Sequence, residues 1–420
     1  MGIPQELVDY IVEMLCDDSR ALKACSLTCR AMLASARPLI HRTLCLTLRT
    51  NFNLFAKEKT FRSTHDKIEL RLLSYKGERS LLQYTRKVYI HMPATSTPDA
   101  LLPHIHYFQS LDRVHTLTIV QYDPIPWMNS MDYYKTCFVH FYPTLTSLTL
   151  SRSSNLYEPL LQFILQFPNL ENLCLEWLEN LGPIQPESTI PSTINKSPPF
   201  RGHLRLAGVE TMAQWPVKFV RKLPNKINFR SVELEDFFGH HAQHTLNACS
   251  STLEDVAIIV DGHGACDPLS LLLTMVEHLT NFPLVGCDGL HELNFTRITI
   301  LRRLTLRIMF PMLSEALKLS TEAVSTITSP LFCEFVLELS GLLPHFRALS
   351  RTYKSDQLRE LDRFLADRFA DREDFTFIVR TPKLHDRETF EWHAREVFSS
   401  LANRGRIRFE MLSSVAGFWR

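Results

Sequence analysis

Apolar residues near the start of the chain recur at the spacing of an amphipathic helix. Leu7, Ile11 and Leu15 repeat at every fourth position with Val8 beside them, which predicts a helix with a wide apolar stripe. Pro4 precedes them at a place where the first turn of a helix tolerates proline.

A second helix is predicted directly afterwards. Residues 17–19 (Asp-Asp-Ser) interrupt the pattern and supply oxygens that can cap a new helix. Leu22, Cys25 and Cys29 then continue at helical spacing, and Arg37-Pro38 is expected to end the helix. Two helices in about 40 residues bury little apolar surface by themselves. They therefore either cap the rest of the protein or dock on another protein.

The middle of the chain predicts a series of short strands with the pattern L-x-x-L-x-L or a near relative. The predicted strands begin at Val114, Leu145, Leu170, Gly202, Phe229, Leu253, Leu290 and Leu301. The best pairs are about 25 residues apart, which is typical of a leucine-rich repeat whose stacked units share one core. This spacing favours an irregular repeat solenoid over another α/β domain with buried parallel strands.

The last third of the chain is more helical. Residues 355–369 predict an amphipathic helix, a strand begins at Phe375, and residues 385–412 predict a helix, a turn and a last strand. This ending would cap the solenoid. The polar, proline-rich segment 183–202 is expected to be a flexible insertion between two strands.

The opening segment resembles the F-box-like motif of large fungal protein families. The matching residues, in order, are Ile3-Pro4, Glu6-Leu7-Val8-Asp9, Ile11, Leu15, Asp17-Asp18, Leu22, Cys25-Ser26-Leu27 and Cys29-Arg30. Met32 stands where these families commonly have Trp, and residues 36–46 resemble their closing turn and strand. The resemblance implies an F-box-like helical module at 1–48, followed by a divergent leucine-rich-repeat-like α/β solenoid at 49–420 with a helical C-terminal cap.

The same resemblance implies a function as the substrate-recognition subunit of an SCF-type cullin-RING ubiquitin ligase. The partners would be the ligase adaptor, the cullin and a protein target held by the repeat region, and the chain itself would not be an enzyme. The residues expected at or just behind the adaptor interface are Ile3, Pro4, Leu7, Val8, Ile11, Leu15, Leu22, Cys25 and Cys29. The alternative is a non-catalytic repeat scaffold or interaction protein with no ubiquitin ligase output.

The composition of the chain limits the classes of partner and the cellular compartment that we expect. The net charge of +1 gives no electrostatic footprint for nucleic acid, and no partner of that kind is expected. The sequence shows no signal peptide and no apolar run of about 18 residues, so we expect no membrane partner and a cytoplasmic or nuclear location.

The sequence contains few residue patterns that are typical of catalysis or metal binding. The ten cysteines include no CxxC pair, and Cys25 and Cys29 are expected to pack rather than to hold zinc. His240 and His244, with Asp261 and His263, could form a metal site, and this is the enzymatic alternative. Phosphate-binding glycine loops and hydrolase motifs are absent from the sequence, so no cofactor and no metal are expected.

Overall fold

The computed structural model describes most of the helices and strands of the chain. The described residues are 3–16, 18–47, 82–92, 105–121, 130–151, 157–176, 201–207, 228–235, 239–260, 293–309, 313–340, 354–382 and 387–412. The chain divides into two compact units, Met1–Phe200 and Arg201–Arg420. The proline-rich segment predicted at 183–202 lies outside the described residues, apart from its last two positions.

The chain opens with three short helices, α1 (Gln5–Glu13), α2 (Ser19–Ser26) and α3 (Arg30–Ile40). As predicted, Asp18 caps α2, and its carboxylate accepts the backbone N–H groups of Arg20 and Ala21, both at 2.9 Å. The single second helix of the prediction is in fact two helices, because Cys29 adopts an extended conformation and its Sγ caps α3.

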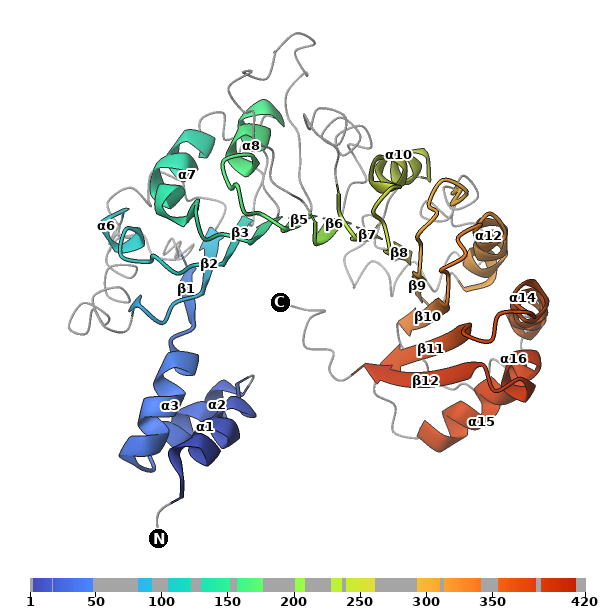
Figure 1. Ribbon diagram of the computed structural model, residues 1–420, viewed down its shortest axis with the longest axis horizontal. Helices are drawn as coiled ribbons and strands as arrows, with labels where there is room; N and C mark the ends of the chain where they lie inside the picture. Colours follow the sequence, from blue (N-terminus) through green and yellow to red (C-terminus); the bar gives the residue numbers. More distant parts are fainter. Residues whose placement is uncertain are drawn as a thin grey trace, which may run out of the picture. The chain divides into compact units, whose positions relative to one another are not determined.

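Twelve described strands follow, and they form a parallel sheet in which the order in space is the order in the sequence (Figure 1). The strands are β1 (Thr43–Thr47), β2 (Lys87–Met92), β3 (Thr116–Gln121), β4 (Ser147–Ser151), β5 (Asn172–Glu176), β6 (His203–Ala207), β7 (Ser231–Glu235), β8 (Asp255–Val260), β9 (Arg303–Met309), β10 (Glu334–Ser340), β11 (Thr376–Pro382) and β12 (Ile407–Leu412).

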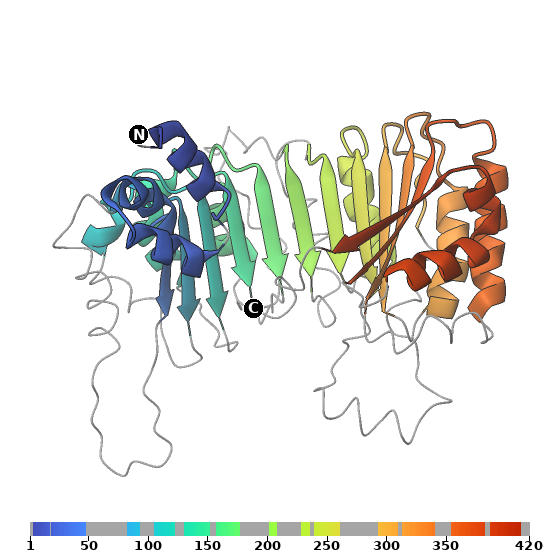
Figure 2. The same cartoon turned by 90° about the horizontal axis from the view of Figure 1, so that it is seen from below.

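In each unit the helices lie on one face of the strands (Figures 1 and 2). In the first unit these helices are α6 (Ile105–Phe108), α7 (Ser130–Phe138) and α8 (Tyr157–Ile164), with a 3-10 turn at Val139–Phe141. In the second unit they are α10 (Gly239–Cys249), α12 (Leu313–Ser325), α14 (Lys354–Arg368), α15 (Arg387–Val397) and α16 (Ser399–Asn403).

The core of each unit lies between the strands and their helices. In the first unit, alternate strand residues such as Leu148 and Leu150 are buried beneath aromatic side chains of the helices, including Phe138. In the second unit, the rings of Phe369 and Phe375 stack 4.3 Å apart. Because successive strand residues point to opposite faces, this alternation leaves every second side chain on the face that the helices do not cover.

The structure corrects the predicted fold class. The prediction of an F-box-like helical module followed by an irregular leucine-rich-repeat-like solenoid is wrong. The fold is an α/β arrangement with a twelve-stranded, all-parallel sheet, preceded by a short helical stretch. The uneven spacing of the strands in the sequence suggested irregularity. Pairing is nevertheless in unbroken register from strand to strand within each unit, because insertions fall between strands and leave the ladders intact.

One predicted strand does not form in its described part. Residues 293–296, the end of the strand expected from Leu290, have no strand conformation, although Leu293 and Phe295 are buried. The carboxamide oxygen of Asn294 accepts the backbone N–H of Thr296 at 2.9 Å. This local turn competes with strand pairing, because it bends the backbone that a ladder would need to be extended.

Within the described residues, no helix combines the length and the apolar character needed to span a membrane. None of the eight described cysteines forms a disulfide with another described cysteine. Cys137 and Cys249 are buried in the core, and burial raises the pKa of each thiol to about 12. A protonated, buried thiol packs as a small apolar group. Of the two cysteines expected to pack, Cys25 is half-buried, whereas Cys29 is exposed.

Candidate protein-docking surface

The three N-terminal helices share a small core of their own. Val8 and Val12 of α1, Leu22 of α2 and Ala36 of α3 are buried together. Met32 packs against this cluster from α3 and is partly buried. Met32 therefore contributes to the packing between the helices at the position where the resembling families carry Trp.

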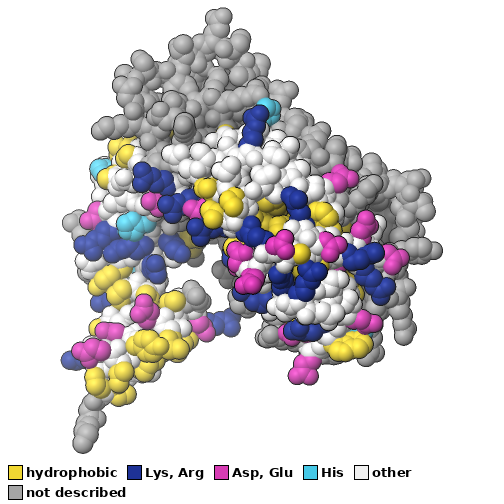
Figure 3. All heavy atoms as spheres, turned by 45° about the vertical axis from the view of Figure 1, so that its right-hand side comes forward, with side chains coloured by type: hydrophobic (Ala, Val, Ile, Leu, Met, Phe, Trp, Pro, Cys, Tyr) yellow, Lys and Arg dark blue, Asp and Glu magenta, His cyan; other side chains and the backbone are white. Residues whose placement is uncertain are grey.

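The opposite face of α1 is apolar and uncovered. Ile3, Leu7, Tyr10, Ile11 and Met14 are exposed large hydrophobic residues, and Leu7 is 53% exposed while Val8 beside it is only 5% exposed. At 3.6 residues per turn Leu7, Tyr10, Ile11 and Met14 form one stripe about 100° wide, and Ile3 stands just before the helix begins. We call this stripe the α1 outer face. Figure 3 shows hydrophobic side chains gathered over the N-terminal helices at the lower left.

This concentration is unusual within the described part of the chain. Ten exposed large hydrophobic residues are found there, and seven of them lie between positions 3 and 33, where Leu27 and Leu33 complete the set. Single exposed hydrophobic residues are ordinary, but a contiguous apolar stripe marks a surface that another molecule covers.

The structure separates the predicted adaptor-contacting residues into three groups. Five of them are exposed: Ile3, Pro4, Leu7, Ile11 and Cys29. Two are half-buried, Leu15 and Cys25, and two are buried between the helices, Val8 and Leu22. Tyr10 and Met14 belong to the α1 outer face but were missed. The spacing of positions 3, 7, 10 and 14 is the helical signal that could have found them.

A polar contact on another side of α1 holds this helix against α3. The carboxamide nitrogen of Gln5 donates to Oδ1 of Asp9 at 2.8 Å and to Oγ of Ser35 at 2.9 Å, and the Ser35 hydroxyl donates to Asp9. These hydrogen bonds, the one from Ser35 above all, hold the pKa of the Asp9 carboxyl below its usual value.

We expect Ser35→Ala to raise the pKa of Asp9 toward its ordinary value. Because the folded pKa of Asp9 is lowered, its contribution to stability is present above the ordinary pKa and is lost as the pH falls through the lowered one. Removing the Ser35 hydroxyl should shrink this contribution. The pKa can be followed from the carboxyl ¹³C shift of Asp9 in Asp-labelled protein. Ser26→Ala is the control, since the Ser26 hydroxyl donates to the Lys23 carbonyl, and an equal shift there would contradict the assignment.

The uncovered face of the sheet in the first unit is polar but carries little charge. The strand registers give three rows of side chains: Thr43, Lys87, Thr116, Ser147 and Asn172; Cys45, Tyr89, Thr118, Thr149 and Cys174; and His91, Val120, Ser151 and Glu176. Lys87 and Glu176 are the charged members of these rows. Burial lowers the pKa of His91, which keeps its ring neutral at pH 7.

The same face of the second unit is densely charged. Arg205 lies 3.1 Å from Glu233 and 2.8 Å from Glu235, and a further series of ion pairs joins β9 to β12. These charges neutralise one another. In the first unit Thr43, Thr116, Ser147 and Thr149 are at least partly exposed with few charged neighbours, and Thr118 and Ser151 are buried. The two units therefore offer different surfaces for recognition.

The histidine pair considered for a metal site is only partly described. His244 lies on α10 and is exposed, while the side chains of His240, Asp261 and His263 lie outside the described residues. No group of three potential metal ligands is found among the described side chains. Cys25 and Cys29 lie at different helix positions, one within α2 and one capping α3.

No protein-family model matches the chain, and no curated protein matches it. The fold and the surface together define a class, namely an α/β protein with a parallel sheet, a short helical stretch and an uncovered apolar helix face.

Proposed function

We propose that this protein is the target-binding subunit of an SCF-type cullin-RING ubiquitin ligase. The helical stretch would dock on the adaptor, and the sheet would hold the target. The observation that carries this proposal is the α1 outer face, which is apolar, contiguous and uncovered. It is supported by the order of residues 3–30, which resembles the F-box-like motif.

The α1 outer face has the physical properties of a docking surface for a grooved protein. Burying a Leu, Ile or Met side chain contributes about 1.5–3 kcal/mol. Four or five such residues on one helix can therefore outweigh the several kcal/mol that association costs. An amphipathic helix that lays its apolar face into a groove is a recurrent mode of recognition. The helices keep their own core of Val8, Val12, Leu22 and Ala36, so docking need not unfold them.

In this proposal the chain contributes position rather than bond chemistry. When the target is held beside the conjugating enzyme that carries ubiquitin, the effective concentration of the target's lysines at that enzyme rises. The hydroxyl-rich face of β1–β5 is the surface that we assign to the target. The cytoplasm or the nucleus is the compartment that this function implies.

The direct test is co-expression of the full chain with a fungal adaptor and cullin, followed by capture of the chain. We expect the adaptor to be retained in one-to-one proportion. An adaptor that is not retained by the intact chain would overturn the proposal. Ubiquitination of a captured target, dependent on the cullin, then separates a ligase subunit from a scaffold that has no ligase output.

A further inference from the structure

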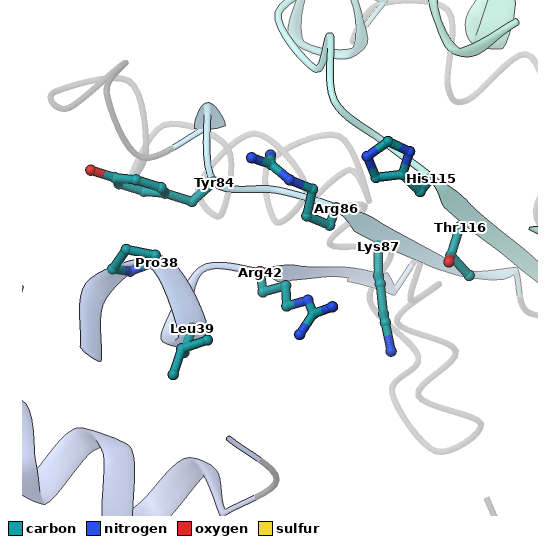
Figure 4. Close-up of a pocket in the computed structure, with 8 residues that line it drawn as sticks. All are labelled: Pro38, Leu39, Arg42, Tyr84, Arg86, Lys87, His115 and Thr116. Atoms are coloured by element: carbon teal, nitrogen blue, oxygen red, sulfur yellow. The ribbon is translucent and has the colours of Figure 1, made fainter. Parts of the chain in front are cut away.

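A pocket of about 360 Å³ lies in the first unit, where α3 ends and the first three strands begin (Figure 4). Pro38 and Leu39 of α3 form one side of it. The remaining residues that line the pocket are Arg42, Tyr84, Arg86, Lys87, His115 and Thr116. This pocket is separate from the α1 outer face, and neither its shape nor its charge is explained by the function proposed above.

The pocket is basic, and none of its described lining residues is acidic. Two of its members are arginines, one is a lysine and one is a histidine. In Figure 4 the guanidinium of Arg42 and the amine of Lys87 point to the same side of the strands. Neither forms an ion pair with an acidic side chain of the described residues. Like charges that line one pocket repel, and a bound anion would relieve that repulsion.

The other two basic groups are held in place by the backbone. The guanidinium of Arg86 donates to the carbonyl oxygens of Gln83 and Thr85, at 2.7 and 3.1 Å. Nδ1 of His115 lies 3.0 Å from the carbonyl oxygen of Thr144 and must donate to it, since a carbonyl can only accept. Arg86 therefore adds positive potential to the pocket, while Arg42 and Lys87 keep their donors available.

The corresponding edge of the sheet in the second unit, where the strands begin, carries charges that are neutralised. The carbonyl oxygen of Arg42 accepts the N–H groups of Arg86 and Lys87, and that of Arg230 accepts those of Glu254 and Asp255 in the same way. Arg42 and Arg230 are therefore equivalent positions.

In the second unit a carboxylate lies between the two arginines of this edge. Glu254 lies 3.9 Å from Arg230 and 3.8 Å from Arg302. In the first unit Arg86 stands before β2 as Glu254 stands before β8, so a cation takes the place of the carboxylate there. Among the described residues no carboxylate pairs with Arg42 or Lys87, which leaves room for an anion from solution.

We propose that this pocket binds the dianion of a phosphate monoester through Arg42 and Lys87. A phosphate monoester brings close to two negative charges and three acceptor oxygens, which match one guanidinium and one ammonium group. The apolar side of the pocket, formed by Pro38, Leu39 and the ring of Tyr84, contacts the organic part of the ester. A carboxylate has half the charge and one oxygen fewer, so it fits this pair of cations less well.

The test is calorimetric titration of the full chain with three probes: inorganic phosphate, phenyl phosphate and a short phosphoserine peptide. We expect phenyl phosphate to bind more tightly than inorganic phosphate, because only the ester reaches the apolar side. Arg42→Ala and Lys87→Gln should each weaken binding about tenfold, as expected for the loss of one charge-assisted contact. Arg302→Ala is the matched control, because Arg302 occupies the equivalent edge next to Glu254, and it should bind as the wild type does.

The outcomes separate the sources of the phosphate. Tighter binding of the phosphopeptide identifies a phosphorylated protein segment, and tighter binding of phenyl phosphate identifies a small phosphorylated molecule. Failure of all three probes, or equal weakening by Arg302→Ala, would show that the pocket is not a phosphate site. Thermal unfolding of each variant shows whether weaker binding reflects a loss of fold. None of these results depends on adaptor capture, so this inference can fail or hold independently of the proposed function.

The pH dependence gives a second readout. The second ionisation of a phosphate monoester has a pKa of about 6, so binding of phenyl phosphate should strengthen as the pH rises from about 5 to 7. Sulfate remains a dianion over this range and should show no such gain. Equal pH dependence for both anions would assign the change to the protein and would contradict recognition of the phosphate dianion.

Discussion

Adaptor binding should fall by at least about a hundredfold when Leu7→Asp is combined with Ile11→Asp. Each carboxylate would be buried without a partner in the complex, and an unpaired buried charge costs several kcal/mol. Both side chains are exposed in the chain by itself, Leu7 at 53% and Ile11 at 42%, so the helices should fold as before. The retained fraction of the adaptor in the capture experiment, or its dissociation constant, measures the effect.

Two matched variants make this result specific. Val139→Asp places the same charge on an exposed apolar residue of the first unit outside the helical stretch, and adaptor binding should not change. Val12→Asp places it in the core shared by the helices, and both helix content and binding should be lost. If the double variant bound the adaptor as well as Val139→Asp does, the α1 outer face would not be the docking surface.

The sequence predicts that α1 is amphipathic but not which part of its apolar surface is covered. Val8 and Leu7 are adjacent apolar residues with the same helical propensity, yet one is buried against α2 and α3 and the other is exposed. Periodicity shows that an apolar surface is wide, and packing decides how much of it the chain itself uses. The exposure of Tyr10 and Met14 becomes visible only when the three helices are placed together.

Strand prediction from the repeat pattern was incomplete. β2 (Lys87–Met92) and β10 (Glu334–Ser340) were missed: β2 buries Val88 and Ile90 in place of leucines, and β10 buries Phe335 and Val336 beside Leu337 and Leu339, so neither reads as an L-x-x-L-x-L repeat. A strand needs only alternation of buried and uncovered side chains. A search for a repeat consensus therefore misses strands that satisfy the alternation with other residues. The search for a repeat consensus also led to the wrong fold class.

Helix ends were predictable only in part. Asp18 is a typical N-cap residue and its role follows from the sequence. Cys29 is not a typical N-cap residue, so the sequence gave no signal that one helix ends before Cys29 and that α3 begins after it. Pro38 lies inside α3 rather than after it, two residues before the end of the helix. The pocket could not be predicted at all, because Arg42, Lys87 and His115 meet only through the strand ladder.

The charged face of the second unit contains one row in which opposite charges alternate across four strands. The register places Arg307 of β9 beside Glu338 of β10, Glu338 beside Arg380 of β11, and Arg380 beside Glu410 of β12. Nε of Arg307 lies 2.5 Å from Glu338, and Nη2 of Arg380 lies 2.7 Å from Glu410. Glu338 has only 1% of its side chain exposed, so it is the member of the row whose charge is least hydrated.

We therefore expect Glu338→Leu to destabilise the second unit by about 3–5 kcal/mol. Glu338 lies between Arg307 and Arg380, so the substitution removes a carboxylate from both arginines in a poorly hydrated place, and breaking a buried ion pair from one side costs about this much. The midpoint of thermal unfolding should fall by roughly 10 °C for a unit of this size. Glu373→Ala removes an exposed carboxylate of the same unit and should leave the midpoint within about 1 °C.

Removing one of the two arginines at the same time should restore much of the loss. In the double variant Arg307→Leu with Glu338→Leu, Arg380 keeps its partner Glu410, and an apolar pair replaces the ion pair on the face of β9 and β10. Replacement of a buried ion pair by apolar residues of similar volume is often neutral. The double variant should therefore unfold at a higher temperature than Glu338→Leu. If it unfolded at the same or a lower temperature, then lost packing around Glu338, rather than the loss of the ion pair between Arg307 and Glu338, would account for the destabilisation.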